Sequence, residues 1–370
     1  MKQIEILPSP DLLEERRKTP LTVKLGIDPT RKDLHFGHLV ALRQLKRLQE
    51  EGHKILIIIG DFTARIGDPT GKNCARPEIS EDEIQQNSIS LIRQIRSVLW
   101  WENLEVRRNS EWLSSLSALD LLQLMRSTTV QQLLVKDGFS KRLDSGSPLH
   151  CHELIYPILQ GFDSVHHDVD LEVGGVDQKF NILFGRSMQR SPQMGMLVPI
   201  LSGTDGRKMS KSLNNTINLS DNPLSMFTKL RRLGDEQVDE FISLLTDGTD
   251  CLDPRDRTRW LACALTSQIH GAELGSLAQK ASRMMAQNQS PPWELLSKVS
   301  EPCTLPPFLR VSQSLVESGL CSSLTESRRM INSGAVWINN KKITEDMIAP
   351  AENFVLRLGR KAAIAVQQKD

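Results

Sequence analysis

The chain has one tyrosine among 370 residues, and it lacks the features that mark several special classes of protein. Its six cysteines show no C-x-x-C spacing, which argues against a zinc motif, and a chain of this length needs no disulfide framework. No apolar run resembles a signal peptide or is long enough to span a membrane. We therefore expect reduced thiols, no membrane segment and a cytoplasmic location.

Net charge is also nearly absent, at +1 from 46 basic and 45 acidic residues. Such a balance neither indicates nor excludes a nucleic-acid partner, so binding of that kind would need a local basic patch. Hydrophobic residues form 39% of the chain and charged residues 25%, as in ordinary globular proteins. The length predicts two or three domains with a sizeable core.

Strand and helix patterns alternate in the first part of the chain. Residues 21–28 and 54–62 read as buried strands, and the leucine stripe of residues 37–52 predicts a helix between them. Further strands are expected at 170–175 and 196–201. This order predicts an α/β fold built on a parallel sheet.

The remaining segments predict helices and then a small mixed module. Residues 80–150 and 220–290 read as mostly helical, and residues 300–308, with three prolines, read as a linker or boundary. The tail combines a helix at 323–334 with a hairpin-like segment at 335–344.

The tail is the most basic part of the chain. Residues 307–370 hold nine Lys or Arg and six Asp or Glu, and four basic residues cluster there: Arg328, Arg329, Lys341 and Lys342. The cluster fits an RNA-backbone surface. A solvated basic face fits the charge count equally well.

Two motifs suggest phosphate chemistry. "DLHFGH" (33–38) places His35 and His38 where the first long helix begins, and a helix N-terminus favours phosphate. Gly37 would let a nucleotide approach the backbone. A metal pair or a helix cap is the alternative. "GRKMSKS" (206–212) places two lysines in a loop that could close over a polyphosphate, although alone it would be an ordinary surface loop.

Two glycine-containing turns carry further polar groups. "GDPTGK" (67–72) reads as a turn and is not a phosphate-binding P-loop, because G-x-x-x-x-G-K-[ST] is absent. "GGVDQ" (174–178) follows a predicted strand, at the end where open α/β sheets bind ligands. Asp177 and Gln178 could hold ribose hydroxyls or an amino acid. An ordinary polar turn is the alternative for each motif.

The single tyrosine lies in "YPILQGFD" (156–163). Tyr156, Gln160 and Asp163 are spaced at i, i+4 and i+7, so a helix places all three on one face. A polar helix face of this composition suggests a binding site.

These segments together resemble class I aminoacyl-tRNA synthetases, and within them the tyrosyl-tRNA synthetases. "HFGH" is similar to the family's HIGH motif, and "KMSKS" matches its second motif. "GDFTARIGDPTGK", "YPILQGFD" and "GGVDQKFN" lie between them in the tyrosyl order. The tail from residue 315 resembles the ribosomal-protein-type RNA-binding domain of the bacterial enzymes.

The resemblance implies that the chain activates L-tyrosine with ATP and then transfers it to the 3′ end of tRNA(Tyr). It implies ATP as a substrate that arrives with magnesium, no tightly bound metal or organic cofactor, and a homodimer. It also implies a Rossmann-like catalytic domain at 1–218 with a helical dimer-interface insertion at about 80–150, an α-helical anticodon-binding domain at 219–300, and a small α+β RNA-binding domain at 308–370.

The matching motifs also imply roles for individual residues. Asp163 would accept the hydrogen bond of the substrate phenol. The set expected at the phosphates and pyrophosphate is Thr30, His35, His38, Lys72, Arg76, Lys208 and Lys211. The set expected at tyrosine is Lys24, Thr63, Asp68, Tyr156, Gln160, Asp163 and Gln178. The set expected at ATP is Gly26, Asp28, Gly37, Gly174, Asp177 and Met209, and the set expected at RNA is Arg328, Arg329, Lys341 and Lys342.

Two positions depart from the family pattern. Lys24 stands where many tyrosyl enzymes have a tyrosine that binds the phenol, and a lysine there would keep Asp163 ionised. Val176 replaces a hydroxyl residue. A paralogue that activates a tyrosine analogue, or a non-catalytic RNA-binding protein on the same scaffold, are the alternatives to the tyrosyl enzyme.

Overall fold

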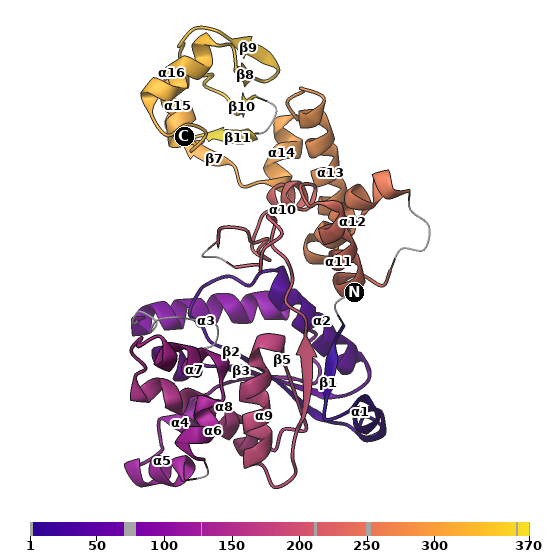
Figure 1. Ribbon diagram of the computed structural model, residues 1–370. Coiled ribbons are helices and arrows are strands. Elements are labelled where there is room, and N and C mark those ends of the chain that lie inside the picture. Colours follow the sequence, from indigo (N-terminus) through magenta and orange to yellow (C-terminus); the bar gives the residue numbers. More distant parts are fainter. Residues whose placement is uncertain are drawn as a thin grey trace. The chain divides into compact units, whose positions relative to one another are not determined.

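The computed structural model describes residues 3–69, 79–126, 128–210, 213–248, 253–359 and 362–369. The chain forms two compact units, Met1–Ser220 and Asp221–Asp370, with their elements labelled in Figure 1. No helix within the described residues is both long enough and apolar enough to cross a membrane.

The first unit is built on a six-stranded sheet in the order β1-β6-β5-β2-β3-β4. The strand bounds are Glu5–Leu7 (β1), Thr22–Ile27 (β2), Lys54–Ile59 (β3), Leu104–Arg108 (β4), Leu171–Gly175 (β5) and Met194–Val198 (β6). Only β1 runs antiparallel, against β6. The expected parallel α/β sheet is confirmed. Strands β3 and β4 follow β2 on one side, whereas β5 and β6 lie on its other side, so the strand order reverses between β2 and β5.

Helices and short 3₁₀ turns connect these strands. Their bounds are Pro10–Arg16 (α1), Phe36–Glu50 (α2), Thr63–Arg65 (η1), Glu81–Arg96 (α3), Ser110–Leu113 (α4), Ala118–Met125 (α5), Val130–Leu134 (α6), Asp137–Asp144 (α7), Cys151–His166 (α8), Val176–Gln178 (η2) and Lys179–Met188 (α9). Helix α2 packs against β3 and β5, and α9 packs against β5 and β6.

The local sequence accounts for the centre of this layer. Ile55, Ile57 and Ile59 are fully buried on one face of β3, and Leu56 and Ile58 are 1% exposed on the other, so the strand is covered on both faces and reads as a continuous apolar run. Helix α2 buries its leucine stripe, and Gly52 follows it with a φ of 92°, a left-handed conformation that suits glycine.

In the described part of the second unit, five helices precede a small sheet. The helices are Pro223–Leu230 (α10), Asp235–Leu245 (α11), Pro254–His270 (α12), Ala272–Ala286 (α13) and Trp293–Val299 (α14). The sheet has the order β7-β11-β10-β8-β9, with bounds Cys303–Leu305 (β7), Val336–Ile338 (β8), Lys341–Ile343 (β9), Phe354–Leu358 (β10) and Ala362–Gln368 (β11). Helices Val311–Glu317 (α15) and Leu324–Asn332 (α16) complete the hydrophobic core on one side of that sheet.

Five of the described strands were missed by the sequence patterns, namely β1, β4, β7, β10 and β11. β4 lies inside the segment 80–150 that was expected to be mostly helical, and β1 precedes the first expected strand. The prediction of a linker at 300–308 is wrong in part, because β7 pairs in parallel with β11 there. The prolines flank β7 without interrupting it, and proline is tolerated beside a short edge strand.

The expected domain limits remain predictions. The boundary after residue 218 lies close to the end of the first compact unit, whereas the expected modules 219–300 and 308–370 fall together in the second unit. Compactness alone therefore does not separate them.

Candidate active site

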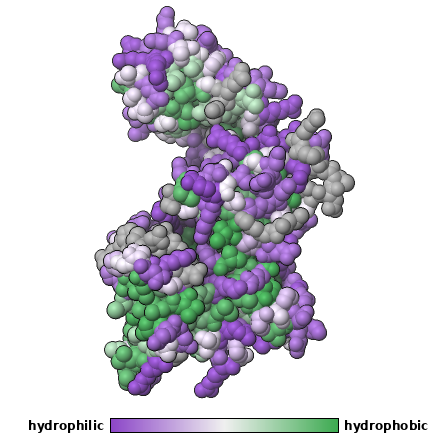
Figure 2. Space-filling view, in the orientation of Figure 1, coloured by the Kyte–Doolittle hydropathy of each residue, from purple (hydrophilic) through white to green (hydrophobic). Residues whose placement is uncertain are grey.

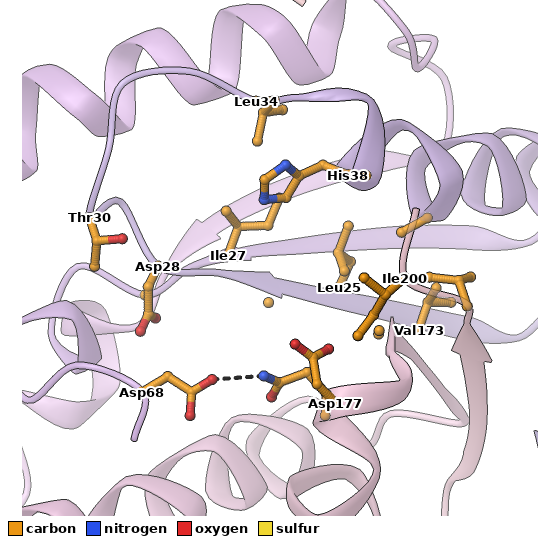
Figure 3. Close-up of a pocket in the computed structure, with 18 of the residues that line it drawn as sticks. Leu25, Ile27, Asp28, Thr30, Leu34, His38, Asp68, Val173, Asp177 and Ile200 are labelled. Carbon is orange, nitrogen blue, oxygen red and sulfur yellow. Dashed lines mark hydrogen bonds between the residues drawn. The ribbon is translucent and has the colours of Figure 1, made fainter. Parts of the chain in front are cut away.

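A cavity of about 650 Å³ lies at the carboxyl ends of the parallel strands of the first unit. Asp28 follows β2, Gly60 follows β3, and Gly174 and Gly175 end β5, so the cavity lies at the reversal point where open α/β sheets bind ligands. Figure 3 shows the carboxyl groups of Asp28 and Asp68 facing this space.

The cavity brings together seventeen of the residues that the sequence nominated for tyrosine and ATP. They are Lys24, Gly26, Asp28, Thr30, His35, Gly37, His38, Thr63, Asp68, Tyr156, Gln160, Asp163, Gly174, Asp177, Gln178, Lys208 and Met209. Lys72, Arg76 and Lys211 lie outside the described residues. The expected shared face of α8 is also found, since Tyr156, Gln160 and Asp163 all line the cavity.

Asp163 forms a buried acidic end of the cavity. Trp112 donates from Nε1 to its Oδ1 at 2.9 Å, and Asn109 donates from Nδ2 to its Oδ2 at 3.3 Å. Burial raises the pKa of Asp163 to about 7, although the nearby Lys24 and the two donors oppose this shift. Near neutral pH this carboxyl group can therefore exist in either protonation state.

Lys24 acts on Asp163 in the expected direction, since its charge lowers the pKa of that carboxyl group, but burial outweighs it and the direct ion-pair partner of Lys24 is Glu172. Lys24 forms an ion pair with Glu172, with 2.9 Å between Nζ and Oε1, and both side chains are about 1–2% exposed. It also donates to the Ser164 hydroxyl at 2.5 Å and to the Gln160 carbonyl at 3.2 Å. These partners occupy the three N–H donors of the ammonium group.

Glu172 in turn gathers the polar groups around it. Its Oε1 accepts from Gln160 at 3.1 Å, and its Oε2 accepts from Ser164 at 3.2 Å and Gln193 at 2.6 Å. A carboxylate can be buried when it is paired and fully hydrogen-bonded, as this one is. The side-chain amide of Gln160 is thereby fixed at the cavity wall.

A chain of amides continues from Gln160. Asn181 donates to Gln160 at 3.0 Å and to Gln178 at 2.9 Å, and Gln178 donates to Asp68 at 2.7 Å, as the dashed line in Figure 3 shows. Lys136 closes this chain, since its Nζ donates to Asn181 at 2.9 Å and lies 3.7 Å from Asp68. Burial lowers the pKa of Lys136, while the charge of Asp68 opposes that effect.

Asp28 accepts hydrogen bonds from two elements that border the cavity, η1 and α8. Thr63 donates to its Oδ1 at 2.8 Å, and Tyr156 donates to its Oδ2 at 3.0 Å. Asn109 bonds both Thr63, at 3.0 Å, and Asp163. The hydroxyl of the only tyrosine in the chain thus helps to hold a carboxylate at the cavity.

His35 and His38 form the N-terminal cap of α2. The Nδ1 of His35 accepts from Gly37 N, and the Nδ1 of His38 accepts from His35 N, each at 3.1 Å. In the neutral imidazoles this pattern puts the proton on Nε2. The proposed alternative of a helix cap is therefore realised, and it leaves the Nε2–H groups as the donors of the two rings.

Two glycines shape the cavity at close range. A Cβ atom at Gly37 would meet the His35 ring at 2.9 Å, so the histidine cap itself needs glycine there. A Cβ atom at Gly26 would meet no protein atom within 4 Å, and Gly26 lines the cavity. The empty space beside Gly26 is therefore available to a ligand.

Lys208 also lines the cavity. Its Nζ is 3.0 Å from Asp177 Oδ2, and its side chain is 54% exposed. The ion pair of an exposed lysine in a loop is weak, so a ligand can displace it.

The four basic residues nominated for RNA lie in the second unit. Arg328 and Arg329 are exposed on α16, and Lys341 and Lys342 are exposed on β9. Arg357 is one of the nine basic residues counted in 307–370, but it is only 1% exposed and does not contribute to a basic surface.

Sequence reasoning missed several polar residues of the site. They are Asn109, Trp112, Lys136, Glu172 and Asn181. Glu172 offered one usable signal, because a charged residue within an otherwise buried strand requires a partner. The others lie on elements whose approach to the cavity no local pattern indicates.

Comparison with known proteins agrees with this geometry. A family model described as tRNA synthetases class I (W and Y) matches residues 16–285, and an S4 domain model matches residues 309–352. A tyrosine–tRNA ligase of Synechococcus elongatus is 44% identical over 342 residues, which cover 88% of this chain and 84% of the relative. The chain belongs to the class I tyrosine–tRNA ligases.

Other relatives support the assignment of the tyrosine–tRNA ligase family. The ligase of Prochlorococcus marinus is 41% identical over 94% of this chain and 90% of its own length. The fold is shared with a tyrosyl-tRNA synthetase from Archaeoglobus fulgidus, solved with L-tyrosine, at a TM-score of 0.60 and 22% identity. That match covers 73% of this chain and 95% of the solved chain.

We expect Lys24→Met to destabilise this tyrosine–tRNA ligase by about 3–5 kcal/mol, because it leaves the Glu172 charge buried without its cation. The double variant Lys24→Met/Glu172→Gln should recover part of that loss. Lys54→Met is the control, since Lys54 is 54% exposed and its ion pair with Glu105 is worth about 0–1 kcal/mol. Urea denaturation followed by circular dichroism measures all three, and equal midpoints for Lys24→Met and Lys54→Met would contradict the prediction.

Proposed function

We propose that the cavity of the first unit carries out both steps of tyrosine–tRNA ligation, with the tyrosine ring directed at Asp163 and the ATP phosphates at His35 and His38. The observation that carries this proposal is the buried carboxyl group of Asp163, which shares a helix face with Tyr156 and Gln160. A buried acid at the end of a cavity selects a ligand that can hydrogen-bond to it.

In the first step, the tyrosine carboxylate attacks the α-phosphorus of ATP and pyrophosphate leaves, which gives tyrosyl-adenylate. In the second step, a hydroxyl of the terminal tRNA ribose attacks the acyl carbon and AMP leaves. Neither step needs a covalent bond to the protein. The side chains contribute by holding the reacting groups in position and by stabilising charge on the departing phosphates.

The tyrosine ammonium group fits the part of the cavity between the acidic end and the amide chain. Tyr156, Gln160 and Asp68 supply oxygens there, with Thr63 and Gln178 beside them. Asp28 is held in the same region by Thr63 and Tyr156, which supports a role at the ammonium group in addition to the expected role at ATP.

The ATP phosphates fit the start of α2. Both rings accept through Nδ1 in the cap, which makes Nε2–H the donor of each ring, and His35, His38 and Thr30 all line the cavity. Binding of the ribose by Asp177 would release Lys208, which could then pair with the phosphates. Gly26, Gly174 and Met209 border the space for the nucleoside. Roles for Lys72, Arg76 and Lys211 at pyrophosphate are proposed from motif matching alone.

Magnesium is proposed to enter with ATP, since this cation keeps several waters and is commonly held through substrate phosphates. We further propose a cytoplasmic location and contact of the exposed residues Arg328, Arg329, Lys341 and Lys342 with the tRNA backbone. Four exposed cations on neighbouring elements of an S4-type module support the latter.

A homodimer is proposed from the apolar surface of the first unit. Helix α5 has no buried residue, although Leu119, Leu122 and Met125 are 65%, 58% and 39% exposed. Val130 and Val135 extend the exposed apolar surface, and Figure 2 shows hydrophobic atoms in the area where Figure 1 places α5. Contiguous exposed apolar side chains of this kind mark an interaction surface.

The reaction is tested by ATP–pyrophosphate exchange with tyrosine, phenylalanine, tryptophan, D-tyrosine and β-tyrosine. We expect exchange with L-tyrosine far above the others. Stronger exchange with an analogue would favour the paralogue and would direct attention to Lys24 and Val176. Binding of tRNA without exchange by any of these amino acids would favour a non-catalytic protein.

We expect kcat/KM for tyrosine to fall by about tenfold per pH unit below pH 7, because the phenol donates to the ionised Asp163, whose pKa is about 7. Asp163→Asn should abolish this titration and reduce discrimination against phenylalanine by about tenfold to a hundredfold. Asp168→Asn, an exposed carboxylate five residues on, is the control. An unchanged pH profile in Asp163→Asn would exclude Asp163 as the titrating group.

We expect Leu122→Glu to yield a monomer of 41.6 kDa, because it places a charge in the proposed apolar interface. Light scattering coupled to size-exclusion chromatography measures the mass. Met347→Glu, at a side chain that is 49% exposed in the second unit, should leave the dimer intact. A wild-type protein that is already monomeric at micromolar concentration would refute the dimer.

A further inference from the structure

The small sheet of the second unit is covered on both faces by different parts of the chain. Side chains alternate along β10, so Phe354 and Leu356 face the core that α15 and α16 complete. Val355 and Arg357 point to the opposite face, and each is only 1% exposed. The second face is therefore also inside the protein.

Helix α14 supplies the cover of this second face. It packs against β10 and β11, which lie beside it in Figure 1, and Trp293 at its start donates from Nε1 to the Val366 carbonyl at 3.1 Å. Val355 and Arg357 pair across the strands with Ala365 and Ala363, which are themselves buried. An S4 module that moved freely would instead expose these apolar side chains to water.

Arg357 is the main polar contact across this interface. Its guanidinium donates to Ser290 Oγ at 3.1 Å, to Asn288 Oδ1 at 2.8 Å and to the Gly359 carbonyl at 2.8 Å. It also lies 4.1 Å from the centre of the Trp337 ring. These acceptors are neutral, and burial lowers the pKa of Arg357. A buried guanidinium held this way depends on every one of its contacts.

The hairpin turn between β8 and β9 holds the same segment from another side. Asn340 has a φ of 69°, a left-handed conformation that asparagine tolerates. Its Oδ1 accepts from Ser290 N, and its Nδ2 donates to the Ser290 carbonyl at 3.2 Å. Ser290, in the segment between α13 and α14, is thus bonded through its backbone by Asn340 and through its side chain by Arg357.

We propose that Arg357, Asn340 and Trp293 fix the S4 module to the segment between α13 and α14, so that the second unit presents its helices and its basic hairpin to tRNA as one rigid body. This inference rests on the proposed function for its role in charging. Rigid docking keeps Arg328 and Lys342 in place before tRNA binds, so binding does not bear the entropic cost of ordering the module.

The test uses the full-length chain and two variants. Arg357→Met removes the hydrogen bonds at similar volume, and Asn340→Gly removes the bonds to Ser290 while keeping the left-handed turn. Gln289→Ala is the matched control, because Gln289 is exposed and adjoins Ser290. Exchange of amide hydrogens in α15 and α16 shows whether the module itself remains folded in each variant.

In both variants we expect amide exchange of residues 288–300 to rise about tenfold, and kcat/KM for tRNA charging to fall about tenfold. Tyrosine-dependent ATP–pyrophosphate exchange should remain unchanged, since it takes place in the first unit. Arg357→Lys should stay defective, because one ammonium group cannot replace the planar guanidinium. Full recovery of charging by Arg357→Lys would show instead that the charge of Arg357, and not docking, matters.

Unchanged amide exchange and unchanged charging in both Arg357→Met and Asn340→Gly would overturn the proposal. Rapid exchange of residues 288–300 in the wild-type chain would do the same. A wild-type chain without tyrosine-dependent exchange would refute the proposed function, whereas the amide-exchange comparison would still decide whether the module is docked.

Discussion

The ion pair between Lys24 and Glu172 is the interaction on which the polar side chains of the cavity depend. Removing both charges from water is costly, so the pair persists only because Ser164, Gln193 and Gln160 complete its hydrogen bonds. The same bonds fix the Gln160 amide, from which the amide chain continues to the carboxylate expected at the substrate ammonium. A buried ion pair in the cavity wall thus orients the polar groups beside it.

Two carboxylates of the cavity have a cation close by. Lys208 pairs with Asp177, and Lys136 lies close to Asp68, so each carboxylate has a cation nearby. Under the proposed function, a substrate ammonium or ribose hydroxyl would replace such a contact, so that each carboxylate keeps a polar partner whether or not substrate is bound. Asp163 differs, because its direct hydrogen-bond donors, Trp112 and Asn109, are neutral and burial outweighs the charge of Lys24.

Much of the fold could be predicted from local patterns. The continuous apolar run of β3 and the leucine stripe of α2 reflect burial on two faces and on one face respectively. The short strands β1, β4 and β7 could not be predicted in this way. Strands of three to five residues carry too little periodicity, and their pairing with distant segments determines them. The burial of Arg357 could not be predicted either, because its partners Ser290 and Asn288 lie far away in the sequence.

The sequence by itself determined the motifs, their order and the shared helix face of Tyr156 and Asp163, because helical spacing and glycine-rich turns are local properties. Only the tertiary structure decided which charges meet. Lys24 and Glu172 are far apart in the chain and pair on adjacent parallel strands, a contact set by sheet order. The raised pKa of Asp163 is likewise a tertiary property, because its burial and its neighbouring hydrogen-bond donors come from the packed fold.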